Sequence, residues 1–139
     1  MIEADLLQYL QGNTALVTAL GGVKQICVIQ APAVLKMPYA IIEAIPGSRK
    51  QMGASKIEEI TMVRISLDCD QAKLMTGRTA IETIKTLLEN YRGKLNGAND
   101  IHITCTSIGG WAGLLGIYRF QFTCTCRFVE NLVKPVPIP

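Results

Sequence analysis

Five cysteines are the residues of this 139-residue sequence that could most readily do chemistry. Two of them, Cys124 and Cys126, lie in the segment IYRFQFTCTCRF, in which every second residue is apolar. This alternation predicts a β-strand with one buried face, and both thiols fall on that face. Neighbours at i and i+2 of a strand lie about 6.6 to 6.8 Å apart with parallel side chains, which disfavours a disulfide between them.

A zinc site is the second chemistry that the thiols could support. Cys69 and Cys105 also fall on the apolar phases of predicted strands, and Cys27 lies in an apolar segment. Structural zinc ligands usually come from turns as C-x2–4-C pairs, and this sequence has no such pair. Cysteine is among the residue types most often buried, and thiols stay reduced in a cytosol. We therefore expect free thiols in the core, and we favour a zinc site over a disulfide as the alternative.

The remaining polar residues predict no catalytic centre. His102 lies on the polar phase of its strand, without a Ser or Cys nucleophile in a recognisable turn. Glu58 and Glu59 point to opposite faces of a strand, and helix capping accounts for Asp68 and Asp70 at a strand-to-helix junction. The segment GGWAGLLG matches neither G-x-G-x-x-G nor the P-loop. We predict no catalytic residue, no cofactor, no bound metal and no enzymatic activity.

The composition fits either a protein whose surface is partly covered by partners or a monomer that carries little charge. Charged residues make up 18% of the chain, below the usual quarter, and the net charge of +3 is too small to indicate a nucleic-acid binder. No run approaches the roughly 18 apolar residues of a membrane span. The start MIEADLLQYL has two acids and no basic flank, unlike a secretory signal. We expect a soluble protein that is not exported.

The elements that must position these residues follow from periodicity and turn signals. Residues 3–11 predict a short amphipathic helix, followed by a helical segment with Thr14 as N-cap and Gly21-Gly22 as its end. Residues 71–91 predict a long helix that begins after Asp70. Its apolar stripe consists of Leu74, Ile81, Ile84, Leu88 and Tyr91. Strands are predicted over residues 24–30, 39–45, 58–69, 101–108 and 117–128.

This order of elements predicts an α+β fold. We expect a four- to five-stranded, mainly antiparallel sheet, with the one long helix packed on a face and a short N-terminal helical segment. The connections, 46–56 and 109–116 among them, are expected to be loops. Residues 1–130 are predicted to form a single domain. Residues 131–139, which contain Pro135 and Pro137, are predicted to form an extended Pro-rich C-terminal arm.

Two surfaces predict contacts with other proteins rather than catalysis. Trp111, Leu114 and Leu115 are large apolar residues in a glycine-rich segment between strands, where solvated polar residues are usual. The polar face of the last strand carries hydroxyls, an amide and two guanidinium groups, which suit a hydrogen-bonded contact surface. Its residues are Arg119, Gln121, Thr123, Thr125 and Arg127.

Several segments resemble the tail-completion or tail-terminator proteins of long-tailed bacteriophages. They are, in order, MIEADLLQYLQGNTALVTALGG, MPYAIIEAI, VRISLDCDQAKLMTGRTAIETIKTLL, LNGANDIHITCTSI and GIYRFQFTCTCRF. The resemblance extends over residues 1–129, and it is the order and spacing of these patterns that carries it. The family often has acidic and polar residues before the last strand, where this chain has GGWAGLLG.

The resemblance implies a structural protein that forms a homo-oligomeric ring, commonly a hexamer, at the head-proximal end of the tail tube. Such a ring stops tube polymerisation during virion assembly and provides the head-joining surface. Its partners are the tail tube protein, the head-completion or connector protein and other copies of the chain, and DNA passes through the lumen without specific binding. No membrane and no cofactor is implied. The protein would occur in the virion tail, and in the host cytoplasm during assembly.

On this basis we expect the interface in the loop 46–56, the loop 109–116 and the arm 131–139, together with the last strand. The interface candidates are Arg49, Lys50, Met52, Lys56, Trp111, Leu114, Leu115, Arg119, Gln121, Arg127, Pro135 and Pro137. Two alternatives remain. The nearer is another head–tail connector component, an adaptor or a stopper. The more distant is a zinc or thiol protein that uses Cys69, Cys105, Cys124 and Cys126.

Overall fold

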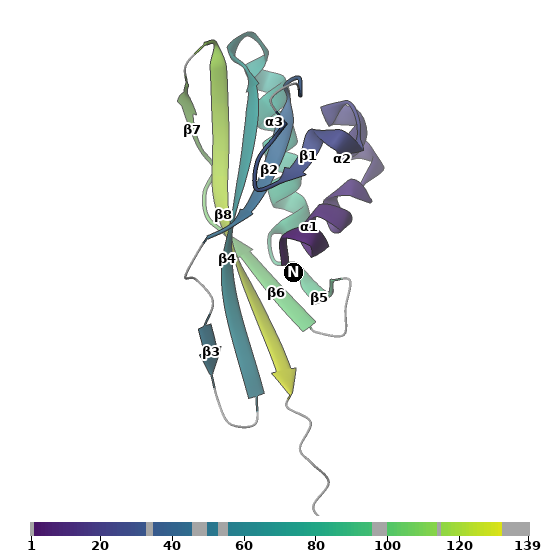
Figure 1. Cartoon of the computed structure of the whole chain (residues 1–139), viewed down its shortest axis with the longest axis vertical. Coiled ribbons are helices and arrows are strands. Elements are labelled where there is room, and N and C mark those ends of the chain that lie inside the picture. The colour runs from purple at the N-terminus through teal and green to yellow at the C-terminus, as the bar shows by residue number, and fades with distance from the viewer. Residues whose placement is uncertain are drawn as a thin grey trace, which may run out of the picture.

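The computed structural model describes residues 2–32, 35–45, 50–52, 56–95, 100–113 and 115–131 of the chain (Figure 1). The helices of this part are α1 (Ile2–Gln11), α2 (Thr14–Leu20) and α3 (Leu74–Leu88), with short 3-10 segments at Val23–Gln25 and Gln71–Lys73. The strands are β1 (Ile26–Val28), β2 (Tyr39–Ala44), β3 (Lys50–Met52), β4 (Lys56–Asp70), β5 (Arg92–Lys94), β6 (Asp100–Cys105), β7 (Gly109–Ala112) and β8 (Ile117–Asn131).

Two long antiparallel strands form the centre of the sheet. β4 and β8 have 15 residues each and pair along their whole length, from Lys56 opposite Asn131 to Asp70 opposite Ile117. The alternating apolar pattern of both strands fixes this register, because a slip of one residue would turn every buried side chain to the other face. We call this pair the β4–β8 ribbon.

Shorter strands complete the sheet on both sides of the ribbon. The main strand order is β1-β2-β4-β8-β6-β5, with β3 as a second partner of β4 and β7 as a second partner of β8. All pairs are antiparallel except β1 with β2, which run parallel. Each edge of the ribbon is therefore paired along most of its length by two strands in succession.

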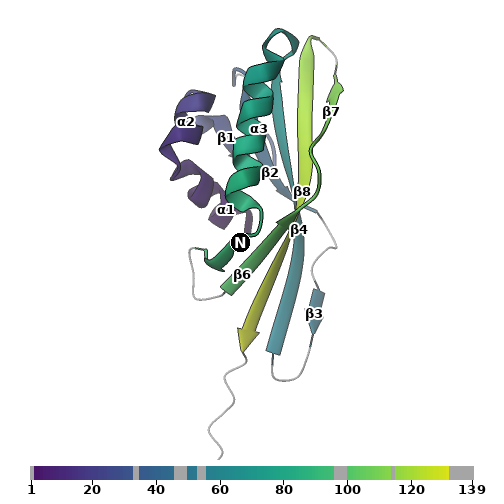
Figure 2. The ribbon, with the colours of Figure 1, turned by 180° about the vertical axis from the view of Figure 1, so that it is seen from behind.

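The helices lie on one face of the sheet, and Figures 1 and 2 show none on the other. α3 packs against β4, β8 and β6, α1 packs against β1 and β2, and α2 packs against α1 and α3. They cover the half of the ribbon that contains Asp70 and Ile117. The other half, which ends at Lys56 and Asn131, extends beyond them (Figure 1).

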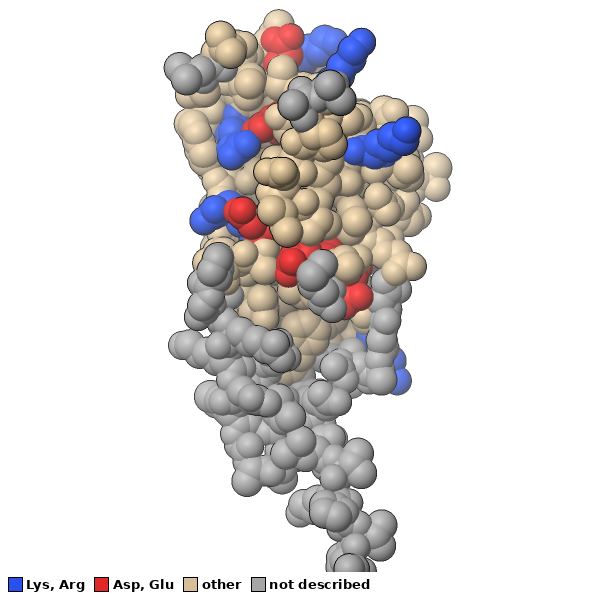
Figure 3. All heavy atoms as spheres, viewed as in Figure 1, with Lys and Arg blue, Asp and Glu red and all other residues tan. Residues whose placement is uncertain are grey.

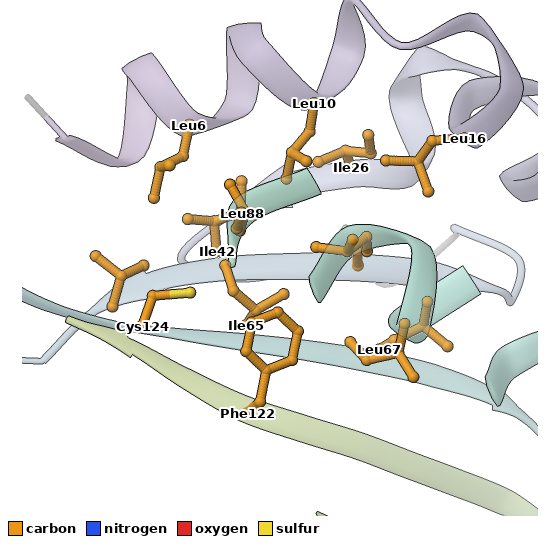
Figure 4. Packing of buried hydrophobic residues seen from close by; sticks show 14 of the residues in the cluster. Leu6, Leu10, Leu16, Ile26, Ile42, Ile65, Leu67, Leu88, Phe122 and Cys124 are labelled. Carbon is orange, nitrogen blue, oxygen red and sulfur yellow. The ribbon is translucent and has the colours of Figure 1, made fainter. Parts of the chain in front are cut away.

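The core lies between the helices and the inner face of the sheet (Figure 4). α1 contributes Leu6 and Leu10 at a spacing of four, which places both on one side of the helix. Ile65 of β4 and Phe122 of β8 are opposite each other in the register and pack beneath them. The alternation in β4 and β8 thus supplies one wall of the core and the helical periodicity supplies the other.

Local sequence signals set the helix ends. Asn13 caps α2, since its side chain accepts a hydrogen bond from the Leu16 N–H at 2.9 Å; the expectation that Thr14 is the cap was wrong by one residue. Gly21 ends α2 with φ of 96°, as expected from Gly21-Gly22. The Asp70 side chain accepts from the Ala72 N–H at 2.9 Å, so Asp70 caps the 3-10 turn Gln71–Lys73 that leads into α3 and not α3 itself.

The mixed α+β class is confirmed, but the expected four to five strands were too few: the described residues form eight. The additional strands β3, β5 and β7 have three or four residues in segments rich in glycine or charge, and were expected to be loops or turns. Only pairing with a neighbouring strand holds them extended, so no local pattern reveals them. The expected loop 109–116 begins as β7, and the expected connection 46–56 contains β3.

The expected N-terminal helical segment consists of two short helices, α1 and α2, and α2 packs against the expected long helix. That helix begins at Leu74 after a 3-10 turn and ends at Leu88, and Leu74 of the expected stripe is 39% exposed, whereas Gly77 and Ala80 are buried. The predicted arm 131–139 lies outside the described residues apart from Asn131. No helix of the described part is both long and apolar enough to span a membrane.

Gly77 allows α3 to approach the sheet, and this yields a first prediction. A Cβ atom at Gly77 would lie 2.9 Å from Cys69 Cβ and closer still to its Sγ. In an open helix Gly→Ala would stabilise by about 1 kcal/mol. Here we expect Gly77→Ala to lower the free energy of unfolding by about 1–3 kcal/mol through overpacking, as measured by urea denaturation.

The double variant Cys69→Ala/Gly77→Ala serves as the control, because it removes the nearest atom, Sγ, from the crowded site. We expect it to lose less stability than the sum of the two single variants. Simple additivity, or stabilisation by Gly77→Ala alone, would contradict the close packing of α3 on β4.

Candidate assembly surface

The face of the sheet opposite the helices is the main candidate for a functional surface, and we call it the outer face. The register brings side chains from five strands together on it. Its residues are Tyr39, Ile41, Glu43, Met62, Arg64, Ser66, Asp68, His102, Thr104, Trp111, Arg119, Gln121, Thr123, Thr125 and Arg127. Figure 3, in the view of Figure 1, shows charged side chains in small separate groups on a mainly uncharged described surface.

A row of four residues crosses the outer face near the Asp70–Ile117 end of the ribbon. Trp111 of β7 lies opposite Arg119 of β8, which lies opposite Asp68 of β4, which lies opposite Tyr39 of β2. Arg119 donates two hydrogen bonds to the Asp68 carboxylate, from Nε at 2.6 Å and from Nη2 at 2.8 Å. This two-pronged geometry is the strongest form of the arginine–carboxylate pair.

Asp68 is the buried member of this row. Its side chain is 5% exposed, whereas that of Arg119 is 39% exposed. The hydrogen bonds that Arg119 donates to Asp68 raise the pKa of Arg119. Burial, followed by the charge and hydrogen bond of Asp68, raises the pKa of Tyr39. Tyr39 and Arg119 thus both contact the Asp68 carboxylate, which little water reaches.

A second ion pair lies further along the same face. Arg64 Nη1 of β4 is 3.1 Å from Glu43 Oε1 of β2, and both side chains are more than two-fifths exposed. The charges of these two pairs cancel. The positions between and beyond them hold threonines, Gln121, Ser66 and Met62, so the middle of the outer face is uncharged and hydrogen-bonding rather than ionic.

A further row of the outer face is basic. It lies toward the half of the ribbon that extends beyond the helices and ends at Lys56 and Asn131, which we call the overhanging half. His102 of β6 lies opposite Arg92 of β5 on one side and Arg127 of β8 on the other. Within the part of the chain that the structure describes, His102 Nε2 is the one buried side-chain nitrogen or oxygen without a hydrogen-bond partner. Buried polar atoms are normally satisfied by a protein group or by ordered water, and Nε2 has no protein partner among these residues.

The structure brings together some of the interface candidates predicted from the sequence. Arg119, Gln121, Arg127 and Trp111 share the outer face, and Trp111 is 48% exposed. Leu115 lies in the turn between β7 and β8 and is 97% exposed, with φ of 58°. Other candidates lie on strand backbones of the overhanging half, namely Lys50, Met52 and Lys56. Arg49, Leu114, Pro135 and Pro137 lie outside the described residues.

Sequence analysis missed several members of the outer face. Asp68 was assigned to helix capping; Asp70 performs that role, and Asp68 forms the ion pair with Arg119. Tyr39, Arg64 and Met62 were not singled out either. The alternation of β4 was a usable signal, because it puts Met62, Arg64 and Asp68 on the face opposite the core, but which strands lie beside it could not be deduced from one strand.

Four of the five thiols, all except Cys27, belong to the core or pack against it. Cys69, Cys124 and Cys126 are buried, Cys27 and Cys105 are half-buried, and all five are free. Burial raises the pKa of Cys126 to about 12 and also raises that of Cys69, while a hydrogen bond with Cys105 and burial raise that of Cys124. Among the described residues, no group of three His, Cys, Asp or Glu could hold a metal ion.

Comparisons with known proteins point to one fold. No protein-family model matches the chain, and no curated protein matches it. The fold is similar to that of a chain in the solved structure of the virion of a native gene transfer agent particle, with a TM-score of 0.72 and 16% sequence identity. The similarity covers 93% of this chain and 95% of that one, so the two share most of their fold.

The buried carboxylate yields a prediction about stability. Arg119→Ala would leave Asp68 at 5% exposure without its cation, and we expect the free energy of unfolding to fall by about 1–3 kcal/mol. Arg64→Ala is the matched control, because it breaks an exposed pair worth less than about 1 kcal/mol. Equal losses in urea denaturation would contradict the special position of Asp68.

The buried thiol yields a prediction about pH. In the unfolded chain Cys126 loses its proton near 9.0, whereas in the folded chain it does so near 12. The folded state therefore binds more protons between these values, and stability present below pH 9 is lost as pH rises, by up to about 1.4 kcal/mol per pH unit. Cys126→Ala should reduce the fall in stability measured between pH 9 and 11. Identical pH slopes for both proteins would refute this assignment.

Proposed function

We propose that this chain is a structural protein of a phage-like particle and that it forms the terminator ring at the head-proximal end of a tail tube. The observation that carries the proposal is the similarity of fold to a chain of a gene transfer agent virion. The resemblance of the sequence to tail-terminator proteins supports the finer assignment. In this role the ring stops tube polymerisation and offers the surface that the head joins.

The outer face supports an assembly role on physical grounds. It is uncovered by helices, its two ion pairs cancel, and its centre consists of neutral hydrogen-bonding side chains. The uncharged centre of this face loses less solvation energy than a charged one would when another protein covers it. Trp111, Tyr39 and Arg119 are of the residue types that dominate binding energy at interfaces, and they share one row.

The two ends of the ribbon differ, which suits a ring. One end carries the exposed Leu115 and the helices, whereas the other is the overhanging half with β3. Contacts between unlike patches of successive copies close into a ring when the rotation permits. We propose a homo-oligomeric ring, commonly a hexamer in the family that the sequence resembles. Further contacts come from the segments 46–56 and 109–116. Residues 131–139, an arm beyond a single domain of residues 1–130, also supply contacts.

The proposed role fits a protein without enzymatic activity. The partners are other copies of the chain, the tail tube protein and a head-completion or connector protein, and DNA passes through the lumen. A net charge of +3 gives such a lumen little grip on DNA. The protein would reside in the virion tail, and in the host cytoplasm before assembly is complete.

The adaptor or stopper role of another connector component is the second candidate, because a likeness of fold does not separate these roles. The zinc or thiol alternative has less support, since the pKa values of Cys69, Cys124 and Cys126 are raised and the described residues contain no metal-binding group. Electron microscopy of particles that lack the protein distinguishes the first two. Abnormally long tails indicate a terminator, whereas normal tails beside unjoined heads indicate a stopper.

The outer face can be tested with one matched pair of variants. Thr104 on the outer face and Thr86 on α3 are both exposed, so a glutamate at either position should leave folding intact. We expect Thr104→Glu to weaken ring formation or binding to assembled tail tubes at least tenfold, and Thr86→Glu to have little effect. Native mass spectrometry and sedimentation with tubes measure both. Equal behaviour of the two variants would remove the outer face from the interface.

A further inference from the structure

Two of the five thiols lie in direct contact across neighbouring strands. Cys105 of β6 lies opposite Cys124 of β8 in the register, and the two Sγ atoms are 3.3 Å apart. Both side chains are on the inner face, where Cys124 is fully buried and Cys105 is half-buried. The contact involves no metal ligand and no part of the outer face, and neither the fold nor the proposed function uses it.

The backbone around this pair has the geometry that a cross-strand disulfide requires. The next pair along, Thr106 and Thr123, is hydrogen-bonded, since the Thr106 N–H donates to the Thr123 carbonyl at 2.9 Å. The Cys105 N–H instead donates to Glu89 Oε1 at 3.3 Å, so Cys105 and Cys124 form the closer, non-hydrogen-bonded kind of pair. In such pairs the Cα atoms are about 4.5 Å apart, within the range that a disulfide spans.

The other thiols lack this relation. Cys126 lies opposite Ile103, Cys69 lies opposite Tyr118 near the far end of the ribbon, and Cys27 is on the edge strand β1. Cys124 and Cys126 are neighbours on one strand with parallel side chains, which is a poor arrangement for a bridge. The register thus selects one pair among the five cysteines.

We propose that Cys105 and Cys124 are an oxidation site that hydrogen peroxide converts into an intramolecular disulfide. Cys105, the more accessible thiol, takes one oxygen atom from peroxide, becomes a sulfenic acid and releases one water. The Cys124 sulfur then attacks the Cys105 sulfur, the S–O bond breaks, and the departing hydroxyl leaves as a second water with the Cys124 proton. Two thiols are oxidised and one peroxide is reduced to two waters.

Burial determines how fast this happens. The Cys124 thiol stays protonated in the folded protein, so its attack is slow compared with that of an exposed thiol. The disulfide would join β6 to β8 across the base of the segment that carries β7, which includes Trp111. If the proposed function holds, a ring assembled from reduced chains in the cytoplasm would become covalently braced after release into an oxidising medium.

The experiment uses the full chain and hydrogen peroxide. After treatment, free thiols are alkylated and the protein is analysed by intact mass and by peptide mapping without reduction. We expect a loss of two hydrogens, one linked peptide pair containing Cys105 and Cys124, and a melting temperature raised by about 5 °C or more that dithiothreitol reverses.

Two variants serve as controls. Cys126→Ala should keep the bridge, whereas Cys105→Ala should abolish both the linked peptide and the rise in melting temperature; Cys105 is half-buried, so its loss is tolerated. A different cysteine pair in the linked peptide, or a Cys105 that oxidises to the sulfinic acid without linking, would overturn the proposal. None of these readouts depends on ring formation, so the disulfide and the proposed function can fail separately.

Discussion

The pairing of β4 with β8 is the constraint on which the rest of the structure depends. Fifteen residue pairs join the two strands without a break, and every other strand attaches to one of them directly or through one neighbour. The side chains on one face of the ribbon, Ile65 and Phe122 among them, pack against the helices. Those on the opposite face include Asp68 and Arg119. A single backbone register therefore determines the core and the candidate assembly surface together.

The two faces of the ribbon use opposite physical means. The inner face is stabilised by burial of apolar side chains and cysteines against three helices. On the outer face the stabilising interactions are polar. Arg119 and Tyr39 contact the buried Asp68 carboxylate, and Arg64 and Glu43 form an exposed ion pair further along. This division leaves one face of the sheet without helices and with an uncharged centre between its ion pairs and its basic row.

Much of the fold could be predicted from alternation and capping. The long strands, the helices around α1 and α3 and the burial of Cys69, Cys124 and Cys126 all follow from residues a few positions apart. What could not be predicted depends on neighbours distant in sequence. β3, β5 and β7 have no pattern of their own, Asp68 looked like a cap until Arg119 was placed opposite it, and the Cys105–Cys124 contact exists only in the register of β6 with β8.

The length of the ribbon also restricts how this chain can change over evolutionary time. Inserting or deleting one residue within β4 or β8 would exchange the roles of the two faces for the remainder of that strand, burying Arg64 or Arg119 and exposing Phe122, unless a bulge absorbed the change. Substitutions are far less restricted, because each position needs only the right polarity and size. Related proteins can therefore lose most of their sequence identity while the number of residues in the two central strands stays the same.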